Sequence, residues 1–153
     1  MPQLETQHLG CIDYEPEHVV VFPAGLPAFE HETRFLVVEQ SSTTPVVFLQ
    51  SLQNPDLVFL TLPAGLVDPG YQLAPASDDL AAIGFEPDQP IEAESLIALA
   101  IVTISPDRKA TANLMAPVLI NRDRRLAVQA LQPWSGYSHQ HSLPVPAGDS
   151  SCS

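Results

Sequence analysis

The sequence contains few basic residues. Its 153 residues include 18 acidic and only 6 basic side chains, which gives a net charge of −12. Residues 1–107 hold 16 of the acidic residues and a single base, Arg34. Such a surface repels nucleic acid and anionic lipid and attracts a basic protein partner. We therefore expect no direct nucleic-acid binding, although surplus acidic residues can also serve solubility alone.

Cysteine and long apolar runs are also scarce. Cys11 and Cys152 are too few for a disulfide framework, and no C-x-x-C pair favours metal or redox chemistry. The longest apolar run, residues 96–102, is far shorter than the ~20 residues of a membrane span. The N-terminus shows neither a basic nor an apolar signal region. We expect a cytoplasmic protein without a membrane segment.

Motifs of common enzymes are missing too. The sequence has no nucleophile elbow, P-loop, dinucleotide-binding motif or zinc-protease motif. His139 and His141 alternate and could meet a metal from one strand face, but no Cys or carboxylate stands beside them. Arg122, Arg124 and Arg125 are too few to predict a phosphate site in so acidic a chain. We expect no enzyme activity, and no catalytic residue, cofactor or metal site.

Apolar segments rich in β-branched residues recur along the chain and favour strands. They cover residues 4–8, 11–14, 19–22, 35–39, 46–51, 57–62, 95–104, 114–120 and 126–131. The central segments are apolar on both faces, which is typical of strands covered on both sides. Pro117 places its strand at an edge or a bulge.

One helix is predicted, over residues 78–83, with Ser77 as its N-cap and Gly84 at its end. Residues 63–69 and 105–111 are interpreted as connections. The pattern predicts an all-β fold, a small closed or partly open β-barrel-like domain with one short helix. The domain covers residues 1–143, and residues 144–153, rich in Pro, Ser and Gly, are expected to be a flexible tail.

The segment Phe22–Glu30 combines two prolines and Gly25 with apolar side chains. Proline fixes φ and glycine permits positive φ, so the segment predicts a stiff, shaped loop between two strands. The residue types favour a loop that plugs the end of the barrel over one that offers its apolar side chains to a partner. Four polar residues beside apolar strands are expected to tie off strand ends and loops rather than to contact a ligand. They are Gln50, Ser51, Asn113 and Asn121.

The chain resembles the FliW family of flagellar assembly factors in four motifs that occur in the family's order. They are Phe22–Glu30, Phe48–Ser51, Thr111–Asn121 and Tyr137–Ser138. The resemblance extends over residues 4–143. The family usually has glycine where this chain has Ala28, and often a basic residue where it has Gln140.

This resemblance implies a non-enzymatic regulator that binds flagellin and, alternatively, CsrA, a small dimeric RNA-binding protein that represses flagellin translation. The two partners exclude each other, so export of flagellin releases the factor to occupy CsrA. CsrA is then antagonised allosterically, away from its RNA groove, and flagellin synthesis rises. An acidic body docked on a basic RNA-binding protein would also lower RNA affinity through its field.

Two surfaces are predicted to bind partners. One is the loop, represented by Phe22, Leu26, Pro27, Phe29 and Glu30. The other is an acidic edge that consists of Glu86, Asp88, Glu92 and Glu94. The alternative function is a small-molecule-binding β-barrel or an unrecognised hydrolase, with the ligand held in the mouth of the barrel.

Overall fold

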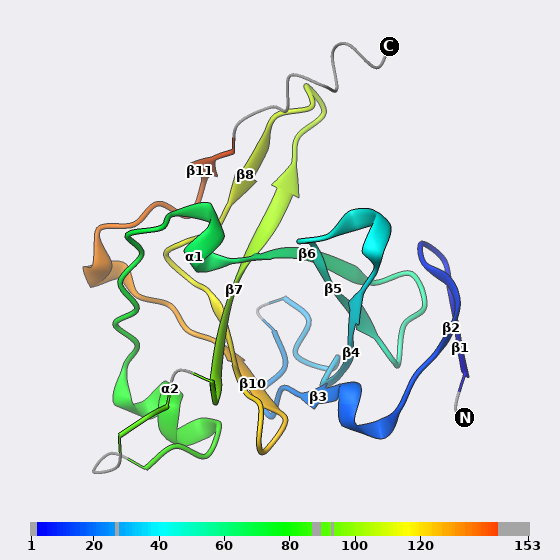
Figure 1. The fold of residues 1–153 in the computed structure, drawn as a ribbon, viewed down its shortest axis with the longest axis horizontal. Coiled ribbons are helices and arrows are strands. Elements are labelled where there is room, and N and C mark those ends of the chain that lie inside the picture. The colour runs from blue at the N-terminus through cyan, green and yellow to red at the C-terminus, as the bar shows by residue number, and fades with distance from the viewer. Residues whose placement is uncertain (1–2, 27, 87–89, 93, 144–153) are drawn as a thin grey trace.

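Strands account for most of the regular structure (Figure 1). The computed structural model describes residues 3–26, 28–86, 90–92 and 94–143. The strands are β1 (Gln3–Thr6), β2 (Gly10–Asp13), β3 (Val19–Val21), β4 (Arg34–Glu39), β5 (Val47–Ser51), β6 (Val58–Pro63), β7 (Leu96–Ile104), β8 (Ala110–Ala112), β9 (Val118–Asn121), β10 (Leu126–Gln129) and β11 (His141–Ser142). The helices are α1 (Ala64–Val67) and α2 (Ser77–Ala82), with 3-10 turns η1 (Pro16–His18), η2 (Ser41–Thr43) and η3 (Pro133–Ser135). The expected tail, residues 144–153, lies outside the described residues and stays a prediction.

A ring of strands forms a closed barrel in the order β7, β6, β5, β4, β3, β10 and β9. Strand β9 pairs with β7 and closes the ring, from Leu96 opposite Asn121 to Leu99 opposite Val118. Neighbours are antiparallel except β3 and β10, which are parallel. Closure leaves the ring without a free strand edge along these ladders. The predicted all-β barrel is therefore confirmed, and its closed form is the correct one.

Strands β4 and β5 are apolar on both faces because both faces are covered. Phe35 and Leu49 belong to the interior cluster and are fully buried. Leu36 and Phe48 belong to a second cluster, to which Leu4 of the β1–β2 hairpin also belongs. The hairpin therefore forms a layer outside the ring. Burying each such large side chain stabilises the fold by roughly 1.5–3 kcal/mol.

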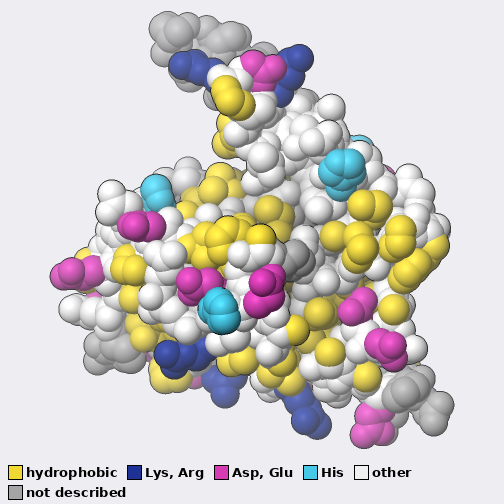
Figure 2. Space-filling view, turned by 180° about the vertical axis from the view of Figure 1, so that it is seen from behind, with side chains coloured by type: hydrophobic (Ala, Val, Ile, Leu, Met, Phe, Trp, Pro, Cys, Tyr) yellow, Lys and Arg dark blue, Asp and Glu magenta, His cyan; other side chains and the backbone are white. Residues whose placement is uncertain are grey.

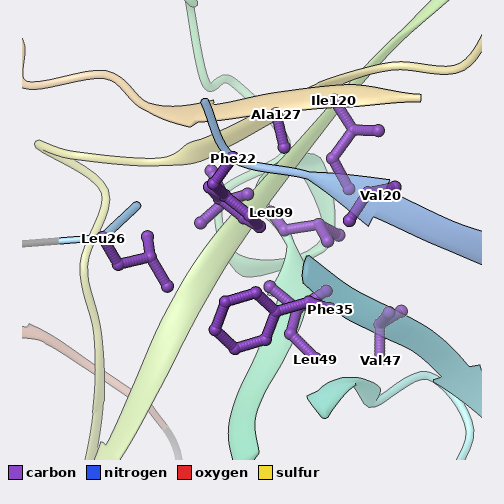
Figure 3. Packing of buried hydrophobic residues seen from close by; sticks show 10 residues of the cluster. Val20, Phe22, Leu26, Phe35, Val47, Leu49, Leu99, Ile120 and Ala127 are labelled. Atoms are coloured by element: carbon purple, nitrogen blue, oxygen red, sulfur yellow. The ribbon is translucent and has the colours of Figure 1, made fainter. Parts of the chain in front are cut away.

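The interior of the barrel is filled by apolar side chains from the ring and from one loop (Figure 3). The rings of Phe22 and Phe35 meet edge to face, with centroids 5.2 Å apart. The cluster consists of Val20, Phe22, Leu26, Phe35, Val47, Leu49, Leu99, Val118, Ile120 and Ala127. Phe22 and Leu26 come from the loop after β3, so this loop is part of the core.

Strand β7 extends beyond the ring and, with β8, forms an arm that projects from the barrel (Figure 1). Its first residues pair with β9 and its last three pair with β8. Residues 113–117 lie between these ladders as a bulge, in which Asn113 Oδ1 accepts the Ala116 N–H at 2.9 Å. The predicted strand over 114–120 is thus wrong in its first half, because Leu114 packs into a separate buried cluster and β9 begins only after Pro117.

The predicted helix is observed as α2, but Ser77 does not cap it. Ser77 is the first helical residue, and the N-cap position is Ala76, without a side-chain cap bond. Gly84 ends the helix as predicted, with φ +93° and its N–H donating to Ala81 O at 3.0 Å. A second short helix, α1, occupies the segment predicted as a connection. Ala64 is buried there in the cluster that includes Ala100 of β7, so packing rather than propensity explains this turn.

Buried amides tie strand ends to neighbouring turns, as the favoured interpretation predicts. Gln50 Nε2 donates to several carbonyl oxygens of the turn after β5, including Ser51 O and Leu57 O, both at 3.1 Å. Asn121 Nδ2 donates to Ile83 O at 2.8 Å, and its Oδ1 accepts two N–H groups of the turn between β9 and β10. Asn121 therefore joins the end of α2 to the end of β9.

Candidate protein-binding surfaces and the barrel mouth

The loop between β3 and β4, residues 22–33, closes one end of the barrel (Figure 1). We call it the plug loop. Phe22 and Leu26 expose 0% and 2% of their surface and lie in the interior cluster. The Phe22 N–H donates to Thr33 O at 2.7 Å, which joins the two ends of the loop. The favoured interpretation of a plug is confirmed for these two apolar residues, whose side chains are not on the surface.

Two residues with positive φ shape the plug loop. Gly25 has φ +69°, and a Cβ there would lie 2.5 Å from the carbonyl oxygen of Glu30. No side chain fits in that space, so the sharp turn requires glycine. Ala28 has φ 70° in a turn closed by the Phe29 N–H, which donates to Leu26 O at 2.7 Å. This turn directs Leu26 inward and leaves Phe29 on the outer side.

The outer side of the plug loop is acidic and aromatic. Phe29 is 39% exposed and meets Phe59 of β6 edge to face, with ring centroids 5.6 Å apart. Glu30 and His31 are exposed beside it. Figure 2 shows acidic side chains and a histidine next to hydrophobic side chains at this end of the barrel. We call Phe29, Glu30, His31 and Phe59 the loop face.

Hydrogen bonds to the end of β5 hold the plug loop that carries the loop face. Glu32 is half-buried, and its Oε2 accepts the hydroxyl of the buried Ser51 at 3.0 Å. Gln53 Oε1 accepts the N–H of Thr33 at 2.9 Å. These bonds fix the plug loop to the end of β5, so Phe29 is presented without a large loss of loop entropy on binding.

The predicted acidic edge lies elsewhere in the molecule. Glu86, Glu92 and Glu94 are exposed, whereas Asp88 lies outside the described residues. The Arg122 N–H donates to Ser95 O at 3.0 Å, so this edge borders the arginine-containing turn between β9 and β10. It is not uniformly acidic for that reason. The acidic edge lies between α2 and β7, whereas the loop face belongs to the loop after β3 and to β6.

The other end of the barrel opens into a pocket that the sequence does not reveal. Glu17 and His18 precede β3 at this end, and the plug loop follows β3 at the other. The pocket has a volume of about 550 Å³ and an apolar floor with a charged rim. Its rim residues are separated by up to about a hundred positions, so only the closed ring brings them together. We call it the mouth pocket.

A network of aromatic and amide side chains fixes the segment after α1 to the segment around η3. The Tyr71 hydroxyl donates a hydrogen bond to Leu114 O at 2.8 Å and accepts one from Gln132 Nε2 at 3.2 Å. Gln132 is fully buried, and its Oε1 accepts the Ala74 N–H at 2.7 Å. The Tyr137 ring lies 4.5 Å from that of Tyr71. Burial raises the pKa of Tyr71 above its ordinary value. Of the side chains in this network, Tyr137 is the one that belongs to the sequence motifs.

The histidine and carboxylate side chains form no metal-binding cluster in the described part of the chain. Within it, no three His, Cys, Asp or Glu side chains are placed to hold a metal ion. His139 is exposed, and His141 lies half-buried in β11. Partial burial, and next the charge of Asp78, raise the pKa of Asp79, but Asp79 does not line the mouth pocket. Among the helices described, none has the length and apolar character to cross a membrane.

The fold and these surfaces define a small closed β-barrel with one plugged end and an acidic and aromatic outer loop. A family model described as FliW protein matches residues 3–143. The chain therefore belongs to the FliW family, a family of flagellar assembly factors.

Relatives and a solved structure agree with this assignment. The flagellar assembly factor FliW of Natranaerobius thermophilus is 35% identical over 143 residues, which cover 92% of this chain and 91% of the relative. That of Syntrophotalea carbinolica is 36% identical over 141 residues, covering 89% and 94%. A crystal structure of the flagellar assembly factor FliW matches with a TM-score of 0.81 and 26% identity, over 95% of this chain and 99% of that one.

Proposed function

We propose that this chain is a cytoplasmic, non-enzymatic flagellar assembly factor that binds flagellin and, alternatively, CsrA. The observation that carries the proposal is the family match over residues 3–143. Bound to CsrA, the factor antagonises its binding to flagellin mRNA and promotes flagellin synthesis. Bound to flagellin, it is withheld from CsrA.

The loop face supports this proposal as a contact surface. Exposed aromatic residues that rest on a rigid base are frequent centres of binding energy at interfaces. Phe29 has this setting, with Phe59 behind it and Glu30 beside it. The flanking carboxylates suit a basic partner, and CsrA, as an RNA-binding protein, is such a partner.

The net charge of −12 supports an indirect effect on RNA. An acidic body beside an RNA-binding protein lowers the local positive potential even where it does not touch the RNA groove. The same charge disfavours direct contact between this chain and RNA.

A competition experiment tests the partner switch. The full-length chain is mixed at low salt with purified CsrA, with a flagellin fragment, and with both, and the mixtures are separated by size-exclusion chromatography. We expect two binary complexes, and we expect excess flagellin to prevent the CsrA complex. Failure of either protein to co-elute contradicts the partner assignment, and a stable ternary complex contradicts mutual exclusion.

The alternative of a small-molecule-binding barrel has one supporting observation, which is the mouth pocket. Its rim and floor contain neither Asn113 nor His139. The loop face at the opposite end is independent of it, so the two kinds of binding are compatible.

A further inference from the structure

The two ends of the barrel differ, because the plug loop fills one of them and the other opens into the mouth pocket. At the plugged end, Phe22 and Leu26 fill the interior. At the mouth pocket, apolar side chains of five strands form a floor that is continuous with the core cluster. These floor residues are Val20, Val37, Val47, Ile97, Leu99 and Ile120. A cavity of about 550 Å³ with such a floor falls within the usual size range of small-molecule sites, roughly 300–1,000 Å³.

The rim of the mouth pocket carries opposite charges on two neighbouring arcs of the ring. Glu39 ends β4, and Glu17 precedes the neighbouring β3. Continuing around the ring, Arg125 precedes β10 and Arg122 follows β9. The strand order β4, β3, β10, β9 therefore places the two carboxylates together and the two guanidinium groups together. The rim is bipolar along this side of the ring, and the apolar floor lies next to both arcs.

These rim charges do not neutralise one another. Across the described residues, the ion pair that the structure contains joins Lys109 to Asp107 on the projecting arm, at 3.8 Å. Arg122 reaches only a backbone oxygen, that of Glu94, at 3.5 Å. The acidic and basic arcs thus line the mouth pocket without an ion pair between them in the described part of the chain.

We propose that the mouth pocket binds a small apolar zwitterion, of the chemical class of a free branched-chain or aromatic amino acid. The α-carboxylate meets Arg122 and Arg125, the ammonium group meets Glu17 and Glu39, and the apolar side chain lies on the floor. Each part of such a ligand has one complementary part of the pocket. An uncharged apolar ligand would leave both arcs without a partner, and a ligand with a single charge would leave one arc without a partner.

The proposal is tested by titrating full-length, ¹⁵N-labelled protein with L-leucine and recording amide resonances. We expect saturable shifts at Val20, Val47 and Ile120, on the floor. The probes 4-methylpentanoate, which lacks the ammonium group, and 3-methylbutylamine, which lacks the carboxylate, should each bind about tenfold or more weakly, since each loses a charge-assisted contact. Absence of floor shifts up to the solubility limit of leucine overturns the proposal, and so does equally tight binding of either probe.

Variants assign the two arcs separately. Arg125→Gln should lower the affinity for leucine about tenfold. It should leave the affinity for 3-methylbutylamine unchanged, because the amine has no carboxylate that Arg125 could bind. Glu39→Gln should weaken leucine and leave 4-methylpentanoate unchanged. Arg108→Gln, on the distant arm, is the matched control and should bind leucine as the wild type does. Since these residues are exposed, folding should be retained; an equal loss in Arg108→Gln and Arg125→Gln would contradict a local site.

Discussion

Ala28 is a strained residue of the plug loop. Its φ of 70° lies in the left-handed region, which disfavours an L-residue by about 1–2 kcal/mol. Glycine adopts this conformation freely but loses about 0.5–1 kcal/mol more backbone entropy on folding. The balance predicts that Ala28→Gly raises the free energy of unfolding by up to about 1 kcal/mol. Urea denaturation should show a higher midpoint with an unchanged slope.

Ala24 provides the matched control in the same loop. It is exposed and is not among the described residues with positive φ. Ala24→Gly should therefore lower the free energy of unfolding by about 0.4–1 kcal/mol, through the unfolded state alone. If both glycine variants lower stability equally, Ala28 is not strained.

Leu26 and Phe29 should separate folding from binding. Leu26 is buried, so Leu26→Ala should lower the free energy of unfolding by about 2–5 kcal/mol in urea denaturation. Phe29 is partly exposed and meets Phe59 edge to face, so Phe29→Ala should cost less than Leu26→Ala: about 0.5–1.5 kcal/mol for the ring pair, together with the loss of its partly buried area. Under the proposed function, Phe29→Ala should also lower the affinity for one of the two partners about tenfold or more.

The control for this binding effect is Ile104→Ala. Ile104 is 58% exposed on the projecting arm, away from the plug loop. Calorimetric titration of CsrA and of flagellin should give wild-type affinities for this variant. A folded Phe29→Ala protein that binds both partners as tightly as Ile104→Ala would remove the loop face from the interface.

The sequence could predict the importance of the plug loop but not the fate of its side chains. Phe22, Leu26 and Phe29 are similarly apolar, so hydrophobicity alone places all three in the core. The turns at Gly25 and Ala28 set which way each side chain points, so Phe22 and Leu26 are buried whereas Phe29 is partly exposed. Whether the predicted residues bind a partner stays a prediction, and Pro27 and Asp88 lie outside the described residues.

At the scale of elements, sequence patterns predicted the strands that are covered on both faces. Strand β5 is buried along its whole length, and its apolar run marks it clearly. Strands β8 and β11 were missed because they have three and two residues of weak strand preference and exist only through pairing with β7 and with each other. The bulge over residues 113–117 likewise depends on contacts distant in sequence. The mouth pocket could not be predicted for the same reason.

The network around Tyr71 links the segment after α1, the segment around η3 and the residues that precede β9. It also makes the stability of the fold depend on pH. Burial raises the folded-state pKa of Tyr71 above its unfolded value of about 10. The neutral phenol is therefore favoured by folding. This stabilisation is fully present below about pH 10 and is lost as the pH rises through the folded-state pKa.

Tyr71→Phe tests this contribution. At about pH 8 the variant should be about 1 kcal/mol less stable, since it loses the bond to Leu114 O. Between about pH 9 and 11 its free energy of unfolding should fall less than that of the wild type, because one titrating group has been removed. Urea denaturation across this range measures both curves. Parallel curves would show that Tyr71 does not carry the pH dependence.

At the scale of the whole molecule, charge and shape act together. The barrel is closed and the plug loop is hydrogen-bonded to the end of β5, so association should need little rearrangement. The net charge of −12 then steers a basic partner over distances up to about the Debye length, ~8 Å at physiological salt. Long-range attraction comes from all acidic residues, whereas short-range affinity comes from the residues in contact.

This division predicts how salt and charge variants affect CsrA binding. The association rate should fall steeply with ionic strength, while the dissociation rate changes little, as stopped-flow measurements can show. Glu92→Gln with Glu94→Gln should slow association if the acidic edge faces the partner, and Glu30→Gln should do so if the loop face does. Because these residues are exposed, each variant should keep wild-type stability. The set with the larger loss of salt dependence identifies the docking end of the barrel, and an association rate independent of salt in the wild type would contradict electrostatic steering.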